Sequence, residues 1–268
     1  MLFRSTRNPA EVQGWSFDAV VVGSDTVWDT SIFGFDPLYF GQLPAPKVVA
    51  YAASCGKQVW SDSPPPAEVV EGLRTFSSIA VRDERTAELV HHATGTCPPC
   101  VVDPVFLPSD RAAFVGRPVS TPERYMLVYG ARYTEADGAF IRSFAARHGC
   151  DIYAVGHRNL WAPHSVMHVS PLEITTWFER AEYVFSSTFH GVVLAVRCGK
   201  PFVAKLHAGN INKSGSLLTM LGLRNRAAEQ LDKLTDVVSM PVDYEAVNQR
   251  LKTERRSSLS FLEQAMRT

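Results

Sequence analysis

Several features are scarce or missing in this sequence, and each absence narrows the range of functions. Lysine and arginine number 27 and so do aspartate and glutamate, so no excess of positive charge indicates a nucleic-acid partner. No apolar run approaches the roughly 20 residues that a membrane-spanning helix needs. Met1 to Asn8 contains two arginines but no long apolar segment follows, so no secretory signal is expected.

Cysteine is also sparse, with five residues in 268. This low, odd count predicts free, mostly buried thiols and a reducing, cytoplasmic location. Cys97 and Cys100 form a Cys-Pro-Pro-Cys motif near His91 and His92, but no second CxxC accompanies it. Because zinc sites usually have four well-spaced ligands, no metal site is predicted there. The sequence also lacks a P-loop and a GxGxxG motif, so no nucleotide cofactor is expected.

Strand and helix signals alternate along the chain. Near-continuous apolar runs predict buried strands, and apolar residues at helical spacing between them predict helices. Asp83 and Ser170 are N-cap candidates, Glu173 stands at the capping-box position, and Gly149 is a stop signal. The predicted strands are Phe17–Gly23, Lys47–Ala53, Ser78–Arg82, a short strand end at Val101–Pro104, Tyr125–Gly130, Asp151–Gly156, Ala181–Phe185 and Phe202–Lys205. The predicted helices are Pro65–Phe76, Asp83–His92, Glu135–His148, Pro171–Glu182, Val192–Cys198, Ser214–Leu223 and Tyr244–Met266.

The length and the 46% hydrophobic content allow one large or two modest domains. Residues 106 to 124 are rich in proline, serine and charged residues and show little periodicity, which indicates a linker. Alternating strands and helices on both sides of it predict parallel sheets covered by helices. We therefore expect an α/β protein of two Rossmann-like domains, residues 1–120 and residues 121–268 with a terminal helix, facing one cleft.

The run Phe185-Ser186-Ser187-Thr188-Phe189-His190-Gly191 is the most informative functional signal. It joins an apolar strand to an apolar helix through hydroxyl residues, a histidine and a glycine. Open α/β sheets bind ligands at such turns, because N–H groups at the start of the helix attract anions. A histidine there can carry a proton beside a bound phosphate or carboxylate. A polar turn whose histidine only bonds its neighbours would give the same pattern, so position alone leaves both interpretations open.

Several short motifs follow one another between residues 17 and 223. They are Gly23-Ser24-Asp25-Thr26-Val27-Trp28, Tyr51-Ala52-Ala53-Ser54, Ile79-Ala80-Val81-Arg82-Asp83, Val102-Asp103-Pro104, and Ser187-Thr188-Phe189-His190-Gly191 followed by Gly199-Lys200-Pro201-Phe202. In order and spacing they resemble the motifs of the polysaccharide pyruvyl transferase family. The resemblance implies a GT-B-like fold of two Rossmann-type domains. It also implies transfer of a pyruvyl group from phosphoenolpyruvate (PEP), a co-substrate, to a hydroxyl acceptor that is often a sugar, with no cofactor and no metal.

The chemistry of PEP assigns candidate roles. Ketal formation requires a proton on C3, attack of an acceptor hydroxyl on C2, loss of phosphate, and donors for about three negative charges. His190 is the candidate acid or base. Arg132 is the candidate cation, because it follows a strand end and the family has a basic residue near there that contacts PEP. The candidate substrate-binding residues are Ser187, Thr188, Gly191, Lys205, His207, Asp25 and Ser24.

Each candidate also has a structural alternative. The basic residues could be solvated loop residues, and the hydroxyl residues and Asp25 could be helix caps. Trp28 could stack on a sugar face or be a core aromatic. Thr188 stands where some relatives carry an arginine, which removes one candidate cation.

The function stays open in three respects. Family members usually begin well upstream of the first motif, whereas the first strand here is expected at Phe17, so we expect a truncated acceptor-side domain. A GT-B-like glycosyltransferase with a nucleotide-sugar donor would share this architecture, and a truncated relative could be a non-catalytic binding or partner subunit. The sequence leaves open whether the acceptor is a saccharide or another hydroxyl compound, and whether the chain forms a homo-oligomer.

Overall fold

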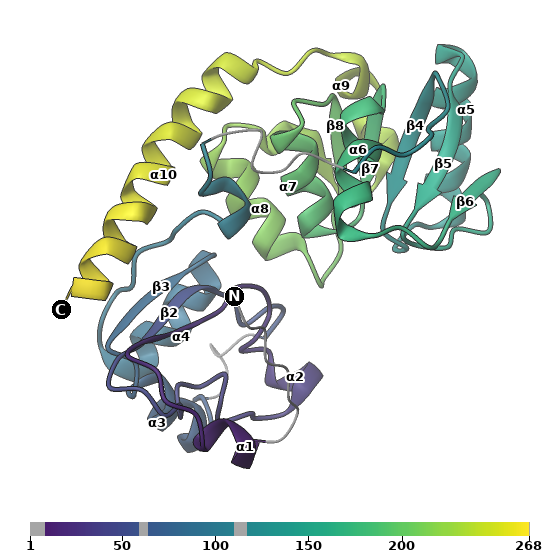
Figure 1. The fold of residues 1–268 in the computed structure, drawn as a ribbon. Helices are drawn as coiled ribbons and strands as arrows, with labels where there is room; N and C mark the ends of the chain where they lie inside the picture. The colour runs from purple at the N-terminus through teal and green to yellow at the C-terminus, as the bar shows by residue number, and fades with distance from the viewer. Residues whose placement is uncertain (1–8, 59–63, 110–116, 268) are drawn as a thin grey trace. The chain divides into compact units, whose positions relative to one another are not determined.

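The computed structural model describes residues 9–58, 64–109 and 117–267, and it divides the chain into two compact units (Figure 1). Unit 1 comprises Met1–Leu107 and Lys252–Thr268, and unit 2 comprises Pro108–Leu251. The sequence places the boundary at residue 120 and the whole terminal helix in the second domain, whereas the units meet at residue 107 and residues 252–268 belong to unit 1. Residues 110–116 of the expected linker lie outside the described part. Whether the two sheets face one cleft stays a prediction.

Unit 1 is built on a parallel sheet with the strand order β1-β2-β3. Its core surrounds Trp28, which is fully buried, stacks on Phe40 at 6.1 Å between ring centroids and donates its indole N–H to the Tyr39 carbonyl at 2.7 Å. The core alternative for Trp28 is therefore confirmed. The elements of this unit that precede residue 108 are α1 Pro9–Gln13, β1 Val20–Val22, α2 Thr30–Phe33, β2 Val48–Ala53, α3 Ala67–Leu73, β3 Ser78–Val81, α4 Glu84–Thr94 and a 3₁₀ helix at Pro104–Phe106.

Two local expectations in unit 1 have different outcomes. Asp83 caps α4 as predicted, because its carboxylate accepts the Thr86 N–H at 3.0 Å. The predicted strand at Val101–Pro104 is wrong. Cys100 forms only an isolated bridge with Val81, and the chain then turns into the 3₁₀ helix, whose N-cap is Asp103.

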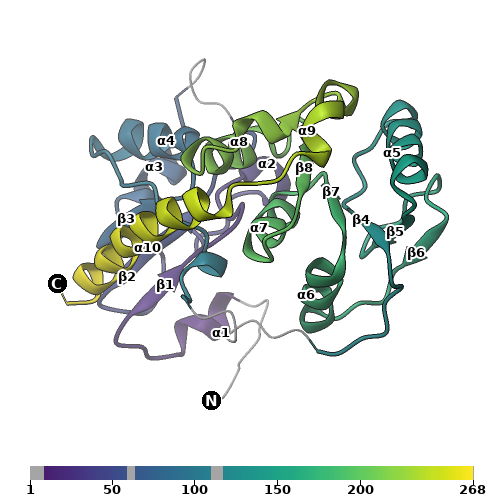
Figure 2. The ribbon, with the colours of Figure 1, turned by 90° about the horizontal axis from the view of Figure 1, so that it is seen from above.

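Unit 2 contains a parallel sheet of six strands in the order β6-β5-β4-β7-β8-β9. Figure 2 labels β6, β5, β4, β7 and β8 along this order. The order reverses between β4 and β7, which is the topological switch point where open α/β sheets bind ligands. The strands are β4 Tyr125–Tyr129, β5 Asp151–Val155, β6 His164–Val166, β7 Tyr183–Ser186, β8 Phe202–Lys205 and β9 Ala227–Ala228. The sequence patterns did not predict β6 and β9.

The helices of unit 2 largely follow their sequence signals. A left-handed Gly149 ends α5 as predicted, and Ser170 and Glu173 form the expected capping box of α6. The helix after the candidate turn begins at Phe189, three residues before the predicted start at Val192. The helices are α5 Glu135–His148, α6 Pro171–Arg180, α7 Phe189–Arg197, α8 Ile211–Met220, 3₁₀ helices at Arg224–Arg226 and Leu231–Leu234, α9 Thr235–Ser239 and α10 Tyr244–Arg267, whose C-terminal part belongs to unit 1.

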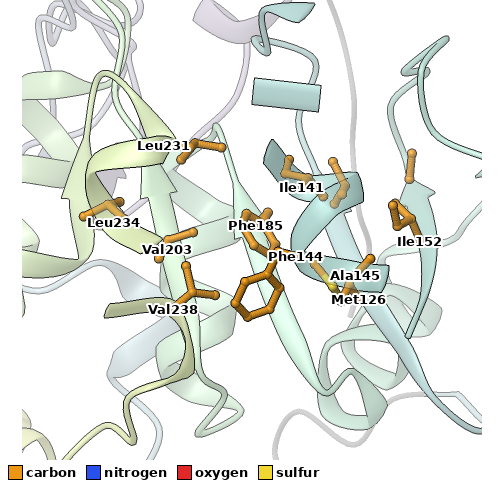
Figure 3. Close-up of a cluster of buried hydrophobic side chains, with 12 residues drawn as sticks. Met126, Ile141, Phe144, Ala145, Ile152, Phe185, Val203, Leu231, Leu234 and Val238 are labelled. Carbon is orange, nitrogen blue, oxygen red and sulfur yellow. The ribbon is translucent and has the colours of Figure 1, made fainter. Parts of the chain in front are cut away.

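A cluster of buried apolar side chains packs against the six-stranded sheet (Figure 3). Phe144 of α5 meets Phe185 of β7 edge-to-face, with ring centroids 5.8 Å apart. Leu231, Leu234 and Val238 extend the cluster from the segment after β9. Burial of each such side chain contributes about 1.5–3 kcal/mol. This packing fixes the strand ends from which the candidate site is built.

Candidate functional site

The candidate site begins where β4 and β7 end side by side, with Tyr129 paired to Ser186. Gly130 follows β4 with a positive φ of 107°, and a Cβ there would clash with the Ser187 side chain. The Ser187 hydroxyl accepts the backbone N–H of Arg132 at 3.2 Å. The loop after β4 is thus joined to the turn after β7, and Arg132, an exposed residue, lies beside that turn.

The turn leads directly into α7. Thr188 is the N-cap, and its hydroxyl accepts the Gly191 N–H at 3.0 Å. A Cβ on Gly191 would lie 2.7 Å from a ring carbon of Tyr129, so the start of α7 approaches β4 as only glycine allows. His190 is half-buried and is the second helical residue, whereas the sequence places it in the turn before the helix. The candidate acid therefore stands at the positive end of the helix dipole.

His207 follows β8 and is held at both ring nitrogens. The Gly209 N–H donates to Nδ1 at 3.1 Å, so Nδ1 carries no proton. Nε2 lies 2.9 Å from the Ser187 carbonyl oxygen and must donate to it, which defines a neutral imidazole protonated at Nε2. Burial lowers the pKa of His207, and the charges of Arg132, Lys205 and Lys213 lower it further against the raising effect of the Ser187 bond.

Three cationic side chains therefore surround this turn. Lys205 is buried and pairs with Asp137 at 2.8 Å and with the Glu229 carbonyl, so its charge is largely compensated. Lys213 is also buried, and its ammonium lies 6.0 Å from the ring centroid of Phe189. Arg132 and Lys213 contribute two further positive charges near the start of α7.

Buried asparagines connect the loops around the site. The side-chain amide of Asn210 donates to the Ser187 and Lys205 carbonyls at 3.1 and 3.0 Å, and its oxygen accepts the His207 N–H at 2.8 Å. Asn159 donates to the Gly130 carbonyl at 2.9 Å. The sequence interpretation missed both asparagines and Lys213. The only local signal was the run of polar residues that begins two positions after β8.

Asp25 and Ser24 belong to unit 1 and follow β1, and Asp25 is part of a charged cluster there. The Asp25 carboxylate pairs with Arg82 at 2.9 Å, and Arg82 also pairs with Asp103 at 3.1 Å. Arg82 and Asp103 are buried, whereas Asp25 is about half-exposed. Asp25 does not cap α2, because Asp29 has that role.

The thiols differ from expectation. Only Cys55 is buried, Cys97 and Cys100 are exposed, and none of the five is in a disulfide, so the prediction of mostly buried thiols is wrong. Cys97 Sγ lies 3.5 Å from His91 Nδ1. Among the described residues, no group of three or more histidine, cysteine or acidic side chains could hold a metal ion. Within the same residues, no helix is long and apolar enough to cross a membrane.

A match to a known protein family covers most of the sequence. The model of the family described as polysaccharide pyruvyl transferase matches residues 2–207. The chain belongs to this family. Membership supports a polysaccharide-modifying transferase, and the matched region includes the Ser187–Gly191 turn together with His207.

Solved structures of other proteins show the same fold. UDP-GlcNAc 2-epimerase from Methanocaldococcus jannaschii matches with a TM-score of 0.50 and 14% identity, over 88% of this chain and 76% of that chain. A mutant O-GlcNAc transferase from Thermobaculum terrenum matches with a TM-score of 0.50 and 14% identity, over 92% of this chain and 52% of that one. These are GT-B-type proteins, and at such identity the likeness shows the fold alone. No curated protein matches the chain.

Proposed function

We propose that the protein transfers a pyruvyl group from PEP to a hydroxyl acceptor, a saccharide in the simplest case. Family membership supports the reaction class. The observation that carries the donor is the turn at the start of α7, where Arg132 is bonded to Ser187, Lys213 lies over the Phe189 ring and the helix presents its N-terminus. PEP is a compact trianion, and such a turn suits its phosphate and carboxylate. The five free cysteines support a cytoplasmic location for the reaction.

The proposed steps balance without a cofactor. His190 donates a proton to C3 of PEP, which becomes a methyl group and leaves an oxocarbenium-like centre at C2. An acceptor hydroxyl adds to C2 and passes its proton to His190, which restores the acid, and a second hydroxyl of the same acceptor displaces phosphate to close the ketal. Hydrogen phosphate leaves with the remaining proton. His190 is preferred as the donor because of its place in the first turn of α7, whereas His207 is held neutral by bonds at both ring nitrogens.

The anion site can be tested by ligand-induced thermal stabilisation. PEP or inorganic phosphate should raise the melting temperature. At a ligand concentration of one hundred times the dissociation constant, binding adds about 2.7 kcal/mol to the free energy of unfolding. Arg132→Ala should abolish most of the shift. Arg147→Ala is the matched control, since Arg147 is exposed in the last turn of α5 and should leave the shift unchanged. An equal shift in both variants would remove Arg132 from the site.

The reaction itself is tested by phosphate release in the presence of PEP and saccharide acceptors. His190→Gln should lower turnover per folded molecule by about 10²- to 10⁴-fold, the usual contribution of a positioned acid, while PEP affinity stays near that of the parent chain. Turnover within a few-fold of the parent would dismiss His190 as the acid. Stabilisation by a nucleotide-sugar but not by PEP would replace the proposal with a glycosyltransferase, and no turnover despite PEP binding would indicate a non-catalytic relative.

A further inference from the structure

A pocket of about 750 Å³ opens inside unit 2, at the carboxyl ends of β8 and β9. Three segments line it: the first turn of α5 with Thr134 and Ala136, the end of β8, and the chain after the 3₁₀ helix that starts at Arg224. The carboxyl edge of a parallel sheet is where α/β folds place their ligands. The volume lies in the range of small-molecule sites.

The floor of the pocket is a buried ion pair. Lys205 Nζ lies 2.8 and 3.1 Å from the two carboxylate oxygens of Asp137 and also donates to the Glu229 carbonyl. The Asp137 carboxylate accepts the N–H and the hydroxyl of Thr134, each at 2.8 Å. Burial alone would raise the pKa of Asp137, but these bonds outweigh it and lower that pKa. The floor is therefore rigid, and its charges are compensated.

The charged lining is balanced throughout. Three cations and three carboxylates line the pocket: Lys205, Arg224, Lys233, Asp137, Glu229 and Asp232. Four of them, all except the floor pair, are exposed. This differs from the turn at α7, where Arg132 and Lys213 favour an anion. Carboxylates only accept hydrogen bonds, and ammonium and guanidinium groups only donate them, whereas each hydroxyl of a sugar does both. An uncharged, hydroxyl-rich ligand fits such a lining better than a phosphate.

Two loops connect the pocket to the anion site. Arg132 and Thr134 are two residues apart, so their Cα atoms are separated by at most about 7 Å. Lys205 and His207 have the same spacing after β8, with Lys205 in the pocket floor and His207 bonded to the Ser187 carbonyl. The loops after β4 and β8 thus contribute residues both to the pocket and to the turn, so the two sites are neighbours at the carboxyl edge of one sheet.

We propose that this pocket holds the acceptor sugar, which places donor and acceptor on the same unit. This inference rests on the proposed function, because it identifies the site of the acceptor for that reaction. Glu229, Asp232 and Lys233 make the directional contacts with the sugar hydroxyls. The ion pair of Lys205 and Asp137 forms a fixed floor.

The binding test uses the full chain and a panel of neutral methyl pyranosides, observed by saturation-transfer NMR and titration. At least one pyranoside should bind. The double variant Glu229→Gln/Asp232→Asn should bind it about tenfold or more weakly, because two charge-assisted hydrogen bonds are weakened. Asp236→Asn is the matched control: Asp236 is exposed in α9, does not line the pocket, and should leave affinity unchanged.

A second variant, Ala136→Trp, fills the pocket without changing any charge. It should abolish pyranoside binding and leave thermal stabilisation by phosphate intact, which also shows that the variant is folded. Pyranoside binding that is unaffected by both variants would overturn the proposal, as would a parent chain that binds no pyranoside or binds only the nucleoside uridine. Because phosphate is measured separately, failure of the pocket and failure of the anion site give different results.

Discussion

The neutral state of His207 has a measurable effect on the pH dependence of stability. The Gly209 N–H requires an unprotonated Nδ1, so protonation of the folded protein breaks that bond. Burial and the neighbouring cations lower the pKa of His207 below its usual value of about 6.5 in an unfolded chain. Between the lowered pKa and 6.5 the unfolded state binds more protons than the folded state. The free energy of unfolding must therefore fall as the pH decreases through this window. Above the window, the contribution of the neutral His207 to stability is complete.

The pH dependence of the free energy of unfolding that comes from His207 is limited, because this group binds at most one proton. A single group changes the free energy of unfolding by at most about 1.4 kcal/mol per pH unit, and the partial exposure of His207 reduces this to a fraction. His157 adds a slope of the same sign, because burial lowers its pKa as well. His207→Gln retains an N–H donor for the Ser187 carbonyl but cannot titrate. It should therefore reduce the acid-side slope and leave the contribution of His157 in place.

Urea unfolding at a series of pH values between about 7.5 and 5 measures this slope. At neutral pH, His207→Gln should have a free energy of unfolding about 1 kcal/mol below that of the parent chain, because the Gly209 N–H loses its acceptor. On acidification, the free energy of unfolding of the variant should fall less than that of the parent chain. His168→Gln is the control, since His168 is exposed on the loop before α6. Parallel curves for the parent chain and His207→Gln would refute the tautomer and the direction of the pKa shift.

Further substitutions test the close approach of α7 to β4, the buried Arg82–Asp103 pair and the hydrogen bonds of Asn210. Gly191→Ala puts a methyl group 2.7 Å from a Tyr129 ring carbon, so it should lower the free energy of unfolding by about 1–3 kcal/mol and abolish the melting shift induced by phosphate. Gly215→Ala is the control: its methyl group meets open space inside α8 and should raise the free energy of unfolding by about 0.5–1 kcal/mol. Equal effects of the two substitutions would contradict the close approach of α7 to β4. Asp103→Asn leaves the buried Arg82 with one fewer carboxylate and should cost about 3 kcal/mol in urea unfolding, and a loss below 0.5 kcal/mol would argue against a buried pair. Asn210→Asp removes both amide donors and should weaken phosphate binding more than tenfold in calorimetry, an effect that unaltered affinity would rule out.

Sequence was most informative where the determining contacts are local. The Ser170 and Glu173 capping box spans three residues, and the Gly149 stop follows its helix directly. These interactions can be recognised from neighbouring letters alone. The alternation of apolar strands and helices likewise predicted the parallel α/β architecture, because strands buried on both faces need continuous apolar runs.

Prediction failed where distant contacts decide the structure. β9 consists of Ala227 and Ala228, which have little strand propensity and are ordered by pairing with β8. The start of α7 was predicted too late because Phe189 and Gly191 are poor helix formers, and the Thr188 cap outweighs them.

The candidate site shows the same division. The turn at Ser187 and the basic residue Arg132 were recognisable from motif and strand ends, and the structure joins them by a hydrogen bond. Asn210 could not be recognised as a connector, because its partner Ser187 lies 23 residues away. The pairing of Arg82 with Asp25 spans 57 residues and was missed for the same reason.

The return of α10 to unit 1 has a consequence for the order in which the protein is completed during synthesis. Ser258 accepts the Val102 N–H at 3.1 Å, and Phe261 and Leu262 pack against the cluster around Tyr51. A ribosome makes all of unit 2 between these two parts of unit 1. The unit whose strands emerge first is therefore the last to gain its full set of contacts. Until α10 emerges, that apolar patch stays uncovered on the nascent chain, which is when chaperones would bind it.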